Sequence, residues 1–237
     1  MHKKGLSFTI LILALSGSVF AQDSQDPVRN TKSYYFTKSG YVTELRDSAY
    51  FTRIMTPDPS NSKLYIVEDS YSDGKLRLKG KSLVPGPYFR GQGRFERYYP
   101  NGNLQETVTY ENGTPTGQYT LQYNDGKLWE LANYSNGKLS GERMTYYPNG
   151  NKRLTANYDN GVLLSSSQFF PNGKLYYSAV SDTAKKLEII GDAYDLAGTQ
   201  TAKNGNGIWV DYADTFKRVF RKGPIINGLK DGEWKVN

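Results

Sequence analysis

The sequence predicts an all-β protein, an extended antiparallel meander of repeated β-hairpins that forms a single-layer sheet. A turn of the form aromatic-x-Asn/Asp-Gly returns every 24 residues and after 23 residues at its last copy. A second series of Asn-Gly turns lies between these copies, and the glycines Gly93, Gly117 and Gly141 keep the same step. A fixed period of this length is typical of an array built from one supersecondary unit.

The turns define the ends of each predicted hairpin. Asn-Gly and Asp-Gly pairs accept the positive φ that tight hairpin turns require, and a preceding Pro suits the first central position of a type I turn. The runs between turns have a normal strand length and alternate polar with apolar residues, as in residues 118–123. The predicted turn glycines are Gly102, Gly113, Gly126, Gly137, Gly150, Gly161 and Gly173.

Residues one period apart are expected to form ladders across neighbouring hairpins, which stabilise a sheet. Such sets include Val108, Ala132 and Ala156, and also Tyr110, Tyr134 and Tyr158. Because a single layer has no second layer to cover it, we expect each tyrosine ring to cover apolar surface while its hydroxyl reaches water.

The repeat also resembles a known family. Residues 110–119 and 134–141 carry Tyr-x-Asn-Gly followed by a further glycine, and residues 227–234 repeat the spacing. This pattern resembles MORN-type repeats, and more closely the bacterial MORN variant of YwqK-type antitoxin proteins and of exported repeat proteins. The resemblance covers about residues 72–236 and implies a scaffold without implying an activity.

The N-terminus has the three-part layout of a secretory signal peptide. Lys3 and Lys4 give a positive start, residues 6–15 are apolar, and Ala21 ends a small-x-small site. We expect cleavage after Ala21 and an exported protein, periplasmic or secreted, with no transmembrane span after cleavage. An uncleaved anchor is the alternative, although the apolar run is short for a span. Cleavage removes two lysines and no acid, so the formal charge falls from +7 to +5.

The chain divides into six predicted segments. Terminal repeats need a cap that covers the raw sheet edge, and we assign that role to the first β-rich segment. Residues 41–46 fit either a helical turn or a strand. The segments are a signal peptide (1–21), a flexible leader (22–32), a β-rich N-terminal cap (33–71), MORN-variant repeats (72–180), a degenerate repeat or loop region (181–206) and C-terminal repeats (207–237).

The composition excludes the common catalytic sets. The chain has no cysteine, and its single histidine, His2, lies in the predicted signal peptide. Cys-His and Ser-His-Asp nucleophile systems and Cys/His zinc sites therefore cannot form in the mature chain. A carboxylate hydrolase using Glu106, Glu130 and Glu142 is the remaining catalytic alternative. It needs a deep pocket that a single-layer sheet rarely offers, so we expect no enzyme, no cofactor and no metal site.

Binding is the expected role. The leading hypothesis is an exported, non-catalytic scaffold that binds a protein partner in the cell envelope, with Tyr and Trp as anchors. A toxin-neutralising protein is implied by the resemblance alone, and a carbohydrate-binding surface formed by Tyr and Trp is a third hypothesis. Export disfavours nucleic acid as a partner. The candidate binding residues lie off the main ladders, where packing between repeats is their alternative role: Tyr98, Trp129, Tyr146 and Tyr177.

Overall fold

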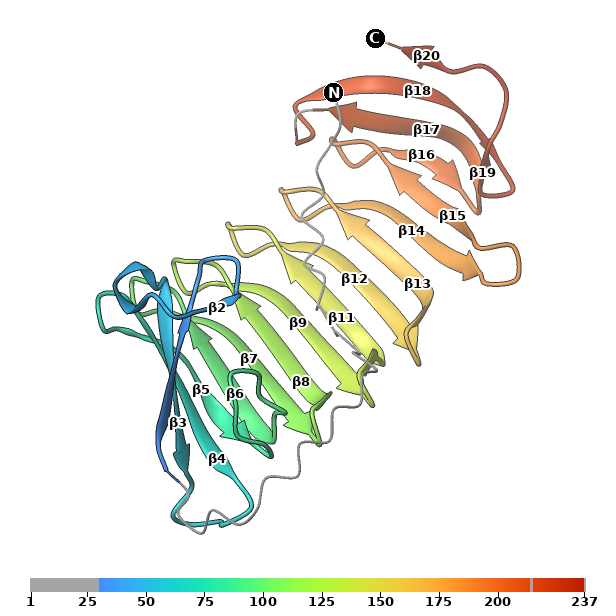
Figure 1. The fold of residues 1–237 in the computed structure, drawn as a ribbon. Coiled ribbons are helices and arrows are strands. Elements are labelled where there is room, and N and C mark those ends of the chain that lie inside the picture. Colours follow the sequence, from blue (N-terminus) through green and yellow to red (C-terminus); the bar gives the residue numbers. More distant parts are fainter. Residues whose placement is uncertain (1–29, 214, 237) are drawn as a thin grey trace.

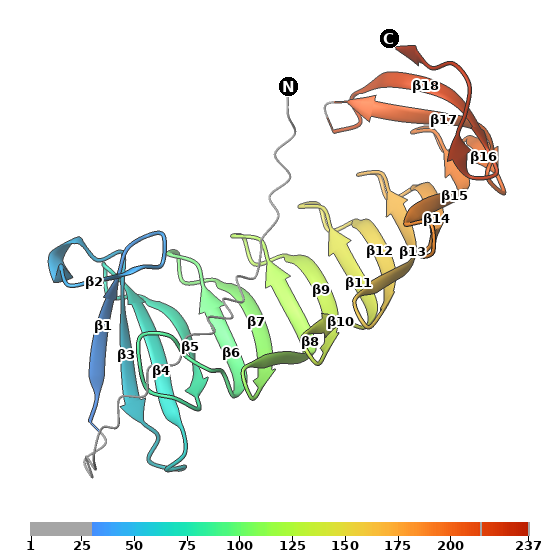
Figure 2. The ribbon, with the colours of Figure 1, turned by 45° about the vertical axis from the view of Figure 1, so that its right-hand side comes forward.

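The computed structural model describes residues 30–213 and 215–236, so the predicted signal peptide and most of the predicted leader lie outside the described residues. Within those ranges, the strands join one antiparallel sheet of 20 strands (Figure 1). Neighbouring hairpins lie side by side from β1 at one end to β18 near the other, and the sheet stays open (Figure 2). The predicted fold class, an all-β meander of hairpins, is confirmed.

The N-terminal part of the sheet contains five strands before the regular repeats. β1 pairs with both β2 and β3, and the remaining pairs follow chain order. The ambiguous residues 41–46 contain the short strand β2, and a 3₁₀ turn at Arg46–Ser48 follows it. The bounds are β1 Lys32–Phe36, β2 Val42–Thr43, β3 Phe51–Pro57, β4 Tyr65–Tyr71 and β5 Leu76–Ser82.

The central hairpins have the predicted turns. Gly102, Gly126 and Gly150 each close a turn with a positive φ of 85–89°. In the intervening series, both Asn112 and Gly113 have positive φ, as a two-residue Asn-Gly turn requires. The central strands are β6 Gly93–Tyr98, β7 Leu104–Glu111, β8 Thr114–Gln122, β9 Leu128–Ser135, β10 Lys138–Leu139, β11 Gly141–Tyr146, β12 Lys152–Asp159 and β13 Val162–Phe169.

The hairpin pattern continues through the predicted degenerate region. Asp195 and Gly198 close a turn through a backbone hydrogen bond of 2.9 Å, at the place where a Pro-Asn-Gly turn would stand. The C-terminal strands are β14 Leu175–Asp182, β15 Leu187–Tyr194, β16 Gln200–Lys203, β17 Asn206–Ala213, β18 Arg218–Ile226, β19 Leu229–Lys230 and β20 Lys235–Val236.

Large buried side chains gather near the two ends of the sheet. One cluster contains Met55, Val67, Leu78 and Phe95. The other contains Phe170, Tyr176, Ala193, Ala202, Trp209 and Ile225. Between them, the predicted ladder positions Ala132 and Ala156 are buried but small. The middle of the sheet therefore has little apolar volume of its own.

Turn tyrosines link each hairpin to the next. The hydroxyl of Tyr99 donates to the backbone carbonyl of Gln122, at 2.6 Å, and the hydroxyl of Tyr123 donates to that of Tyr146, at 2.7 Å. Tyr71 and Tyr147 make the equivalent bonds. We expected tyrosine hydroxyls to reach water; each of these turn tyrosines also uses its hydroxyl to bind the protein backbone. The reason is that the next hairpin places a carbonyl within reach.

Candidate binding surface

One face of the sheet carries a row of ionised side chains, and we call it the charged face. Residues directly opposite on antiparallel strands share a face. Arg53 lies opposite Asp69, Asp69 opposite Leu78, and Leu78 opposite Arg97. Arg97 in turn lies opposite Glu106. The charged face is defined by Arg53, Asp69, Arg97, Glu106 and Glu130, because Leu121 connects Glu106 to Glu130 in the same register.

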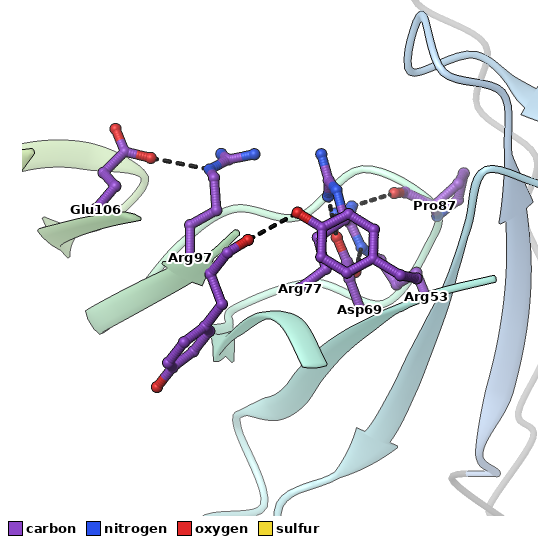
Figure 3. A network of polar contacts seen from close by, with 8 residues as sticks. Arg53, Asp69, Arg77, Pro87, Arg97 and Glu106 are labelled. Atoms are coloured by element: carbon purple, nitrogen blue, oxygen red, sulfur yellow. Dashed lines mark hydrogen bonds and ion pairs between the residues drawn. The ribbon is translucent and has the colours of Figure 1, made fainter. Parts of the chain in front are cut away.

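Asp69 is the centre of a buried network at the N-terminal end of this face (Figure 3). Its side chain is 0% exposed and accepts hydrogen bonds from Arg53 Nε at 2.7 Å and Arg53 Nη2 at 2.8 Å. Arg77 Nη1 donates to the same carboxylate at 2.8 Å. Arg53 Nη1 also donates to the Pro87 carbonyl at 2.7 Å, so the loop before β6 is tied to this network. Removing one partner from a buried ion pair is strongly destabilising, so we assign this carboxylate and its two guanidinium groups to the stability of the fold.

Arg77 is more exposed than Arg53, and the guanidinium groups of both lie over the Phe51 ring. The guanidinium carbon of Arg77 lies 3.9 Å from the centre of the Phe51 ring, and its side chain is 17% exposed. Burial lowers the pKa of Arg77, and the positive charge of the nearby Arg97 lowers it further. Figure 3 shows the guanidinium groups of Arg77 and Arg97 on the same side of the sheet.

Two more ion pairs continue the row. Arg97 Nε donates to Glu106 at 2.9 Å, and Arg143 donates to Glu130 through Nε at 2.7 Å and Nη2 at 2.9 Å. The hydrogen bond with Glu130 raises the pKa of Arg143 above its usual value. Burial raises the pKa of Tyr119, as do the negative charges of Glu106 and Glu130. Tyr119 therefore stays a neutral phenol near both carboxylates.

The three glutamates of the hydrolase alternative are not brought together. Glu106 and Glu130 are each bound to an arginine. Glu142 precedes Arg143 on β11 and lies opposite Asn157, so its exposed side chain belongs to the other face. Glu142 is therefore separated from the other two glutamates by the sheet, because a step of one residue along a strand changes the face.

A β-bulge in each turn hairpin places one extra residue beside the turn aromatic. The register shift between Leu121 and Gln122 leaves Trp129 as the extra residue of β9. The same shift recurs on β5, β7, β12 and β14. In every case the extra residue stands six positions after the turn aromatic. We call these residues the bulge row: Arg77, Gln105, Trp129, Arg153 and Tyr176.

The contacts of the bulge row place it along the turn-bearing margin of the charged face. Arg77 binds Asp69 there, and the Trp129 ring stacks on the turn residue Tyr123 with 5.7 Å between ring centres. Arg153 is the extra residue of β12, six positions after the turn residue Tyr147. Burial raises the pKa of Tyr123 and of Tyr147, and the positive charge of Arg153 opposes both shifts. Tyr176 is buried in the C-terminal cluster, which leaves the first four members accessible.

The four aromatic residues predicted for binding do not form one patch. Trp129 belongs to the bulge row. Tyr98 and Tyr146 lie on the opposite face, where the Tyr98 hydroxyl donates to Glu96 at 2.6 Å and the Tyr146 hydroxyl to Met144 Sδ at 3.4 Å. Tyr177 packs against the C-terminal cluster, and burial raises its pKa to about 12.

Sequence reasoning missed the arginines of the charged face and the role of the bulge. The signal was present: Arg77 and Arg153 stand six residues after Tyr71 and Tyr147, at the same offset as Trp129 from Tyr123. A comparison of the repeats at that offset alone finds the row.

The opposite face carries an open trough of about 400 Å³ between β12 and β15. Its side chains are uncharged and rich in hydroxyl groups, including those of Thr155, Ser165, Ser167 and Ser178. Among the residues that the structure describes, no group of three or more His, Cys, Asp or Glu could hold a metal ion. No helix within the described ranges is long and apolar enough to cross a membrane.

Comparisons with known proteins match the repeat. The model of the MORN repeat variant matches residues 92–112, 115–136 and 139–160. No curated protein matches this chain. Among solved structures, "Crystal Structure of TarM" is similar over 44% of this chain and 20% of that chain, with 15% identity and a TM-score of 0.28. A similarity this low carries no argument about fold or function.

Proposed function

We propose that this MORN-repeat β-sheet protein is an exported, non-catalytic scaffold that binds a protein partner in the cell envelope through the charged face. One observation carries the proposal: hairpins of the same construction present arginine and tryptophan side chains in a row along one face. Arginine and tryptophan are the residues most enriched among binding hot spots. The N-terminal sequence supports export.

A rigid sheet suits this role. The turn tyrosines fix each hairpin against the next, so the side chains of the charged face are held at defined spacings before a partner arrives. Preorganisation of this kind lowers the entropic cost of association. The ion pairs of Glu106 and Glu130 hold carboxylates in structural contacts, which agrees with a face that binds and does not react.

A toxin-neutralising role is a narrower form of the same proposal, in which the partner is a toxin. The positive formal charge and the arginines of the charged face favour an acidic partner in either case. A toxin gene next to the gene for this protein, with a product that binds the protein tightly, would support the toxin-neutralising role over binding of another partner.

The experiment is site-directed crosslinking in the native host, followed by mass spectrometry. A photoreactive amino acid replaces Gln105 of the bulge row in one variant and Asn133 of the opposite face in another. We expect one predominant envelope protein to be crosslinked from position 105 and not from position 133. Crosslinking from neither position, or a cytoplasmic location in cell fractionation, would contradict the proposal.

A further inference from the structure

The repeats hold one position constant and vary another. Tyr71, Tyr99, Tyr123 and Tyr147 occupy the same turn position, and each donates its hydroxyl to the next hairpin. Six residues later the bulge row reads Arg, Gln, Trp, Arg and Tyr. A position with the same contact in four successive repeats serves the scaffold; the fifth repeat has Phe170 there, whose ring is buried in the C-terminal cluster. A position that changes from repeat to repeat in a fixed geometry is free to specify what the array binds.

The arginines at the N-terminal end of the row have unused donors. Arg77 uses Nη1 for Asp69, and Arg97 uses Nε for Glu106. Within the described residues, no hydrogen bond engages the other guanidinium nitrogens of Arg77 or the Nη groups of Arg97. Each guanidinium has five N–H donors in a planar fork, so both can bind a further carboxylate.

The charges named on this face do not cancel. Between β3 and β12, five arginines (Arg53, Arg77, Arg97, Arg143 and Arg153) face three carboxylates (Asp69, Glu106 and Glu130), which leaves a formal excess of two positive charges in that part of the face. Glu188 lies further along the same face, on β15, where it accepts a hydrogen bond from Ser166. Arg153 is exposed, and no ion pair to it is seen among the residues that the structure describes. The excess therefore lies at two places, around Arg77 and Arg97 and at Arg153.

The spacing of these places fits an extended chain. Neighbouring strands lie about 4.8 Å apart, so Trp129 is about 19 Å across the sheet from Arg77, and Arg153 about 10 Å further on. An extended polypeptide covers about 3.3 Å per residue, so these steps correspond to about six and about three residues. A segment of about ten residues spans the whole row.

From this juxtaposition we propose that the partner presents an extended acidic segment that crosses the strands along the bulge row. Carboxylates of the segment bind Arg77 and Arg97 at one end and Arg153 at the other, and an apolar side chain between them packs on Trp129. This inference rests on the proposed function and names the chemistry of its partner.

The test measures fluorescence anisotropy of a labelled peptide of about twelve residues. The probe has two glutamates at one end, a leucine about six residues on, and two glutamates about three residues after the leucine. The double variant Arg97→Gln/Arg153→Gln is expected to weaken binding about tenfold or more, a loss of about 1.4 kcal/mol. Trp129→Ala is expected to weaken binding of the leucine probe more than binding of a probe that has serine in place of the leucine.

A matched control uses neighbouring cations of the opposite face. Arg94→Gln/Lys152→Gln removes the same charge from exposed residues of the same two strands, and we expect binding within about twofold of the unchanged protein. Equal loss in both double variants would overturn the inference, because net charge alone would then explain binding. Binding to phosphatidylglycerol vesicles but not to the probe would also overturn it, since the surface would then recognise lipid phosphate.

The crosslinking experiment separates the two proposals. If position 105 captures the same envelope protein with and without Arg97→Gln/Arg153→Gln, the acidic-segment inference fails and the scaffold function stands. If position 105 captures no protein, the scaffold function fails. Loss of that crosslink in the arginine variant, but not in Arg94→Gln/Lys152→Gln, supports both.

Discussion

The middle of the sheet and its two ends are held together differently. At the ends, large side chains such as Phe95 and Phe170 are buried in clusters. In the middle, the buried apolar residues are the alanines Ala132 and Ala156, and hairpins are joined by the backbone ladder and by tyrosine hydroxyls. A single layer of small central residues cannot nucleate a core, so the end clusters anchor an array that is regular but thin.

The two ends also differ from each other. The C-terminal cluster is aromatic, with Phe170 surrounded by Tyr176, Tyr212 and Phe216. The N-terminal cluster adjoins the ionised network of Asp69, which ties β3, β4 and β5 together through Arg53 and Arg77. Burial of apolar area stabilises one end, and the other adds a charge network that is costly to break.

The largest expected effect is at the aromatic end. Phe170 is 0% exposed, with ring centres 4.8–5.5 Å from Tyr176, Tyr212 and Phe216. Phe170→Ala is expected to lower the free energy of unfolding by about 3–5 kcal/mol, because it leaves a cavity among fixed rings. Urea unfolding followed by circular dichroism measures the change. The control Phe220→Ala removes a side chain that is 42% exposed and should cost less than about 1 kcal/mol. Similar losses in both variants would mean that the cluster is not a core.

The next effect tests the charge network. Asp69→Asn keeps the shape of the side chain but removes the charge that balances buried Arg53 and part-buried Arg77. We expect a loss of about 3 kcal/mol, the lower end for breaking a buried ion pair, because the amide oxygen still accepts a hydrogen bond. The same urea titration serves as the measurement. Asp73→Asn, in an exposed turn pair with Lys75, is the control and should change stability by about 0.5 kcal/mol or less. A loss at Asp69 no larger than that of the control would show that the network is dispensable.

The sequence was sufficient for the features that depend on neighbouring residues. The turns at Asn112-Gly113 and Asn136-Gly137 follow from local φ preferences, and the ladder of Ala132 and Ala156 follows from the period. The match at residues 92–160 agrees with the expected MORN variant for the regular repeats.

The candidate surface depended on contacts that sequence periodicity does not contain. A bulge shifts which residues oppose each other, so a strict alternation places Trp129 only as a residue off the ladders and does not single out Arg153. The pairing of Asp69 with Arg53 depends on the register of β3 against β4, and the tyrosine hydroxyl bonds depend on the distance between successive turns. Both depend on how strands that are apart in the sequence are placed in the folded sheet.

The smallest expected effect tests how the middle is held. Tyr123→Phe removes the hydroxyl that donates to the Tyr146 carbonyl, while the ring that stacks on Trp129 remains. We expect a loss of about 1 kcal/mol, the usual net contribution of one hydrogen bond, measured by urea unfolding. The control Tyr41→Phe changes a residue that is 70% exposed and should leave stability within about 0.5 kcal/mol.

The local readout for Tyr123→Phe is amide hydrogen exchange, which should accelerate in β11 and β12 more than in β3 and β4. That pattern would follow because the bond joins the hairpin of Tyr123 to the next one along the sheet. Exchange unchanged in β11, together with a stability loss no greater than that of Tyr41→Phe, would mean that the backbone ladder alone joins the middle hairpins. The recurrence of tyrosine at the turn position would then need another explanation. The interpretation of that position as the one that holds neighbouring hairpins together would be contradicted.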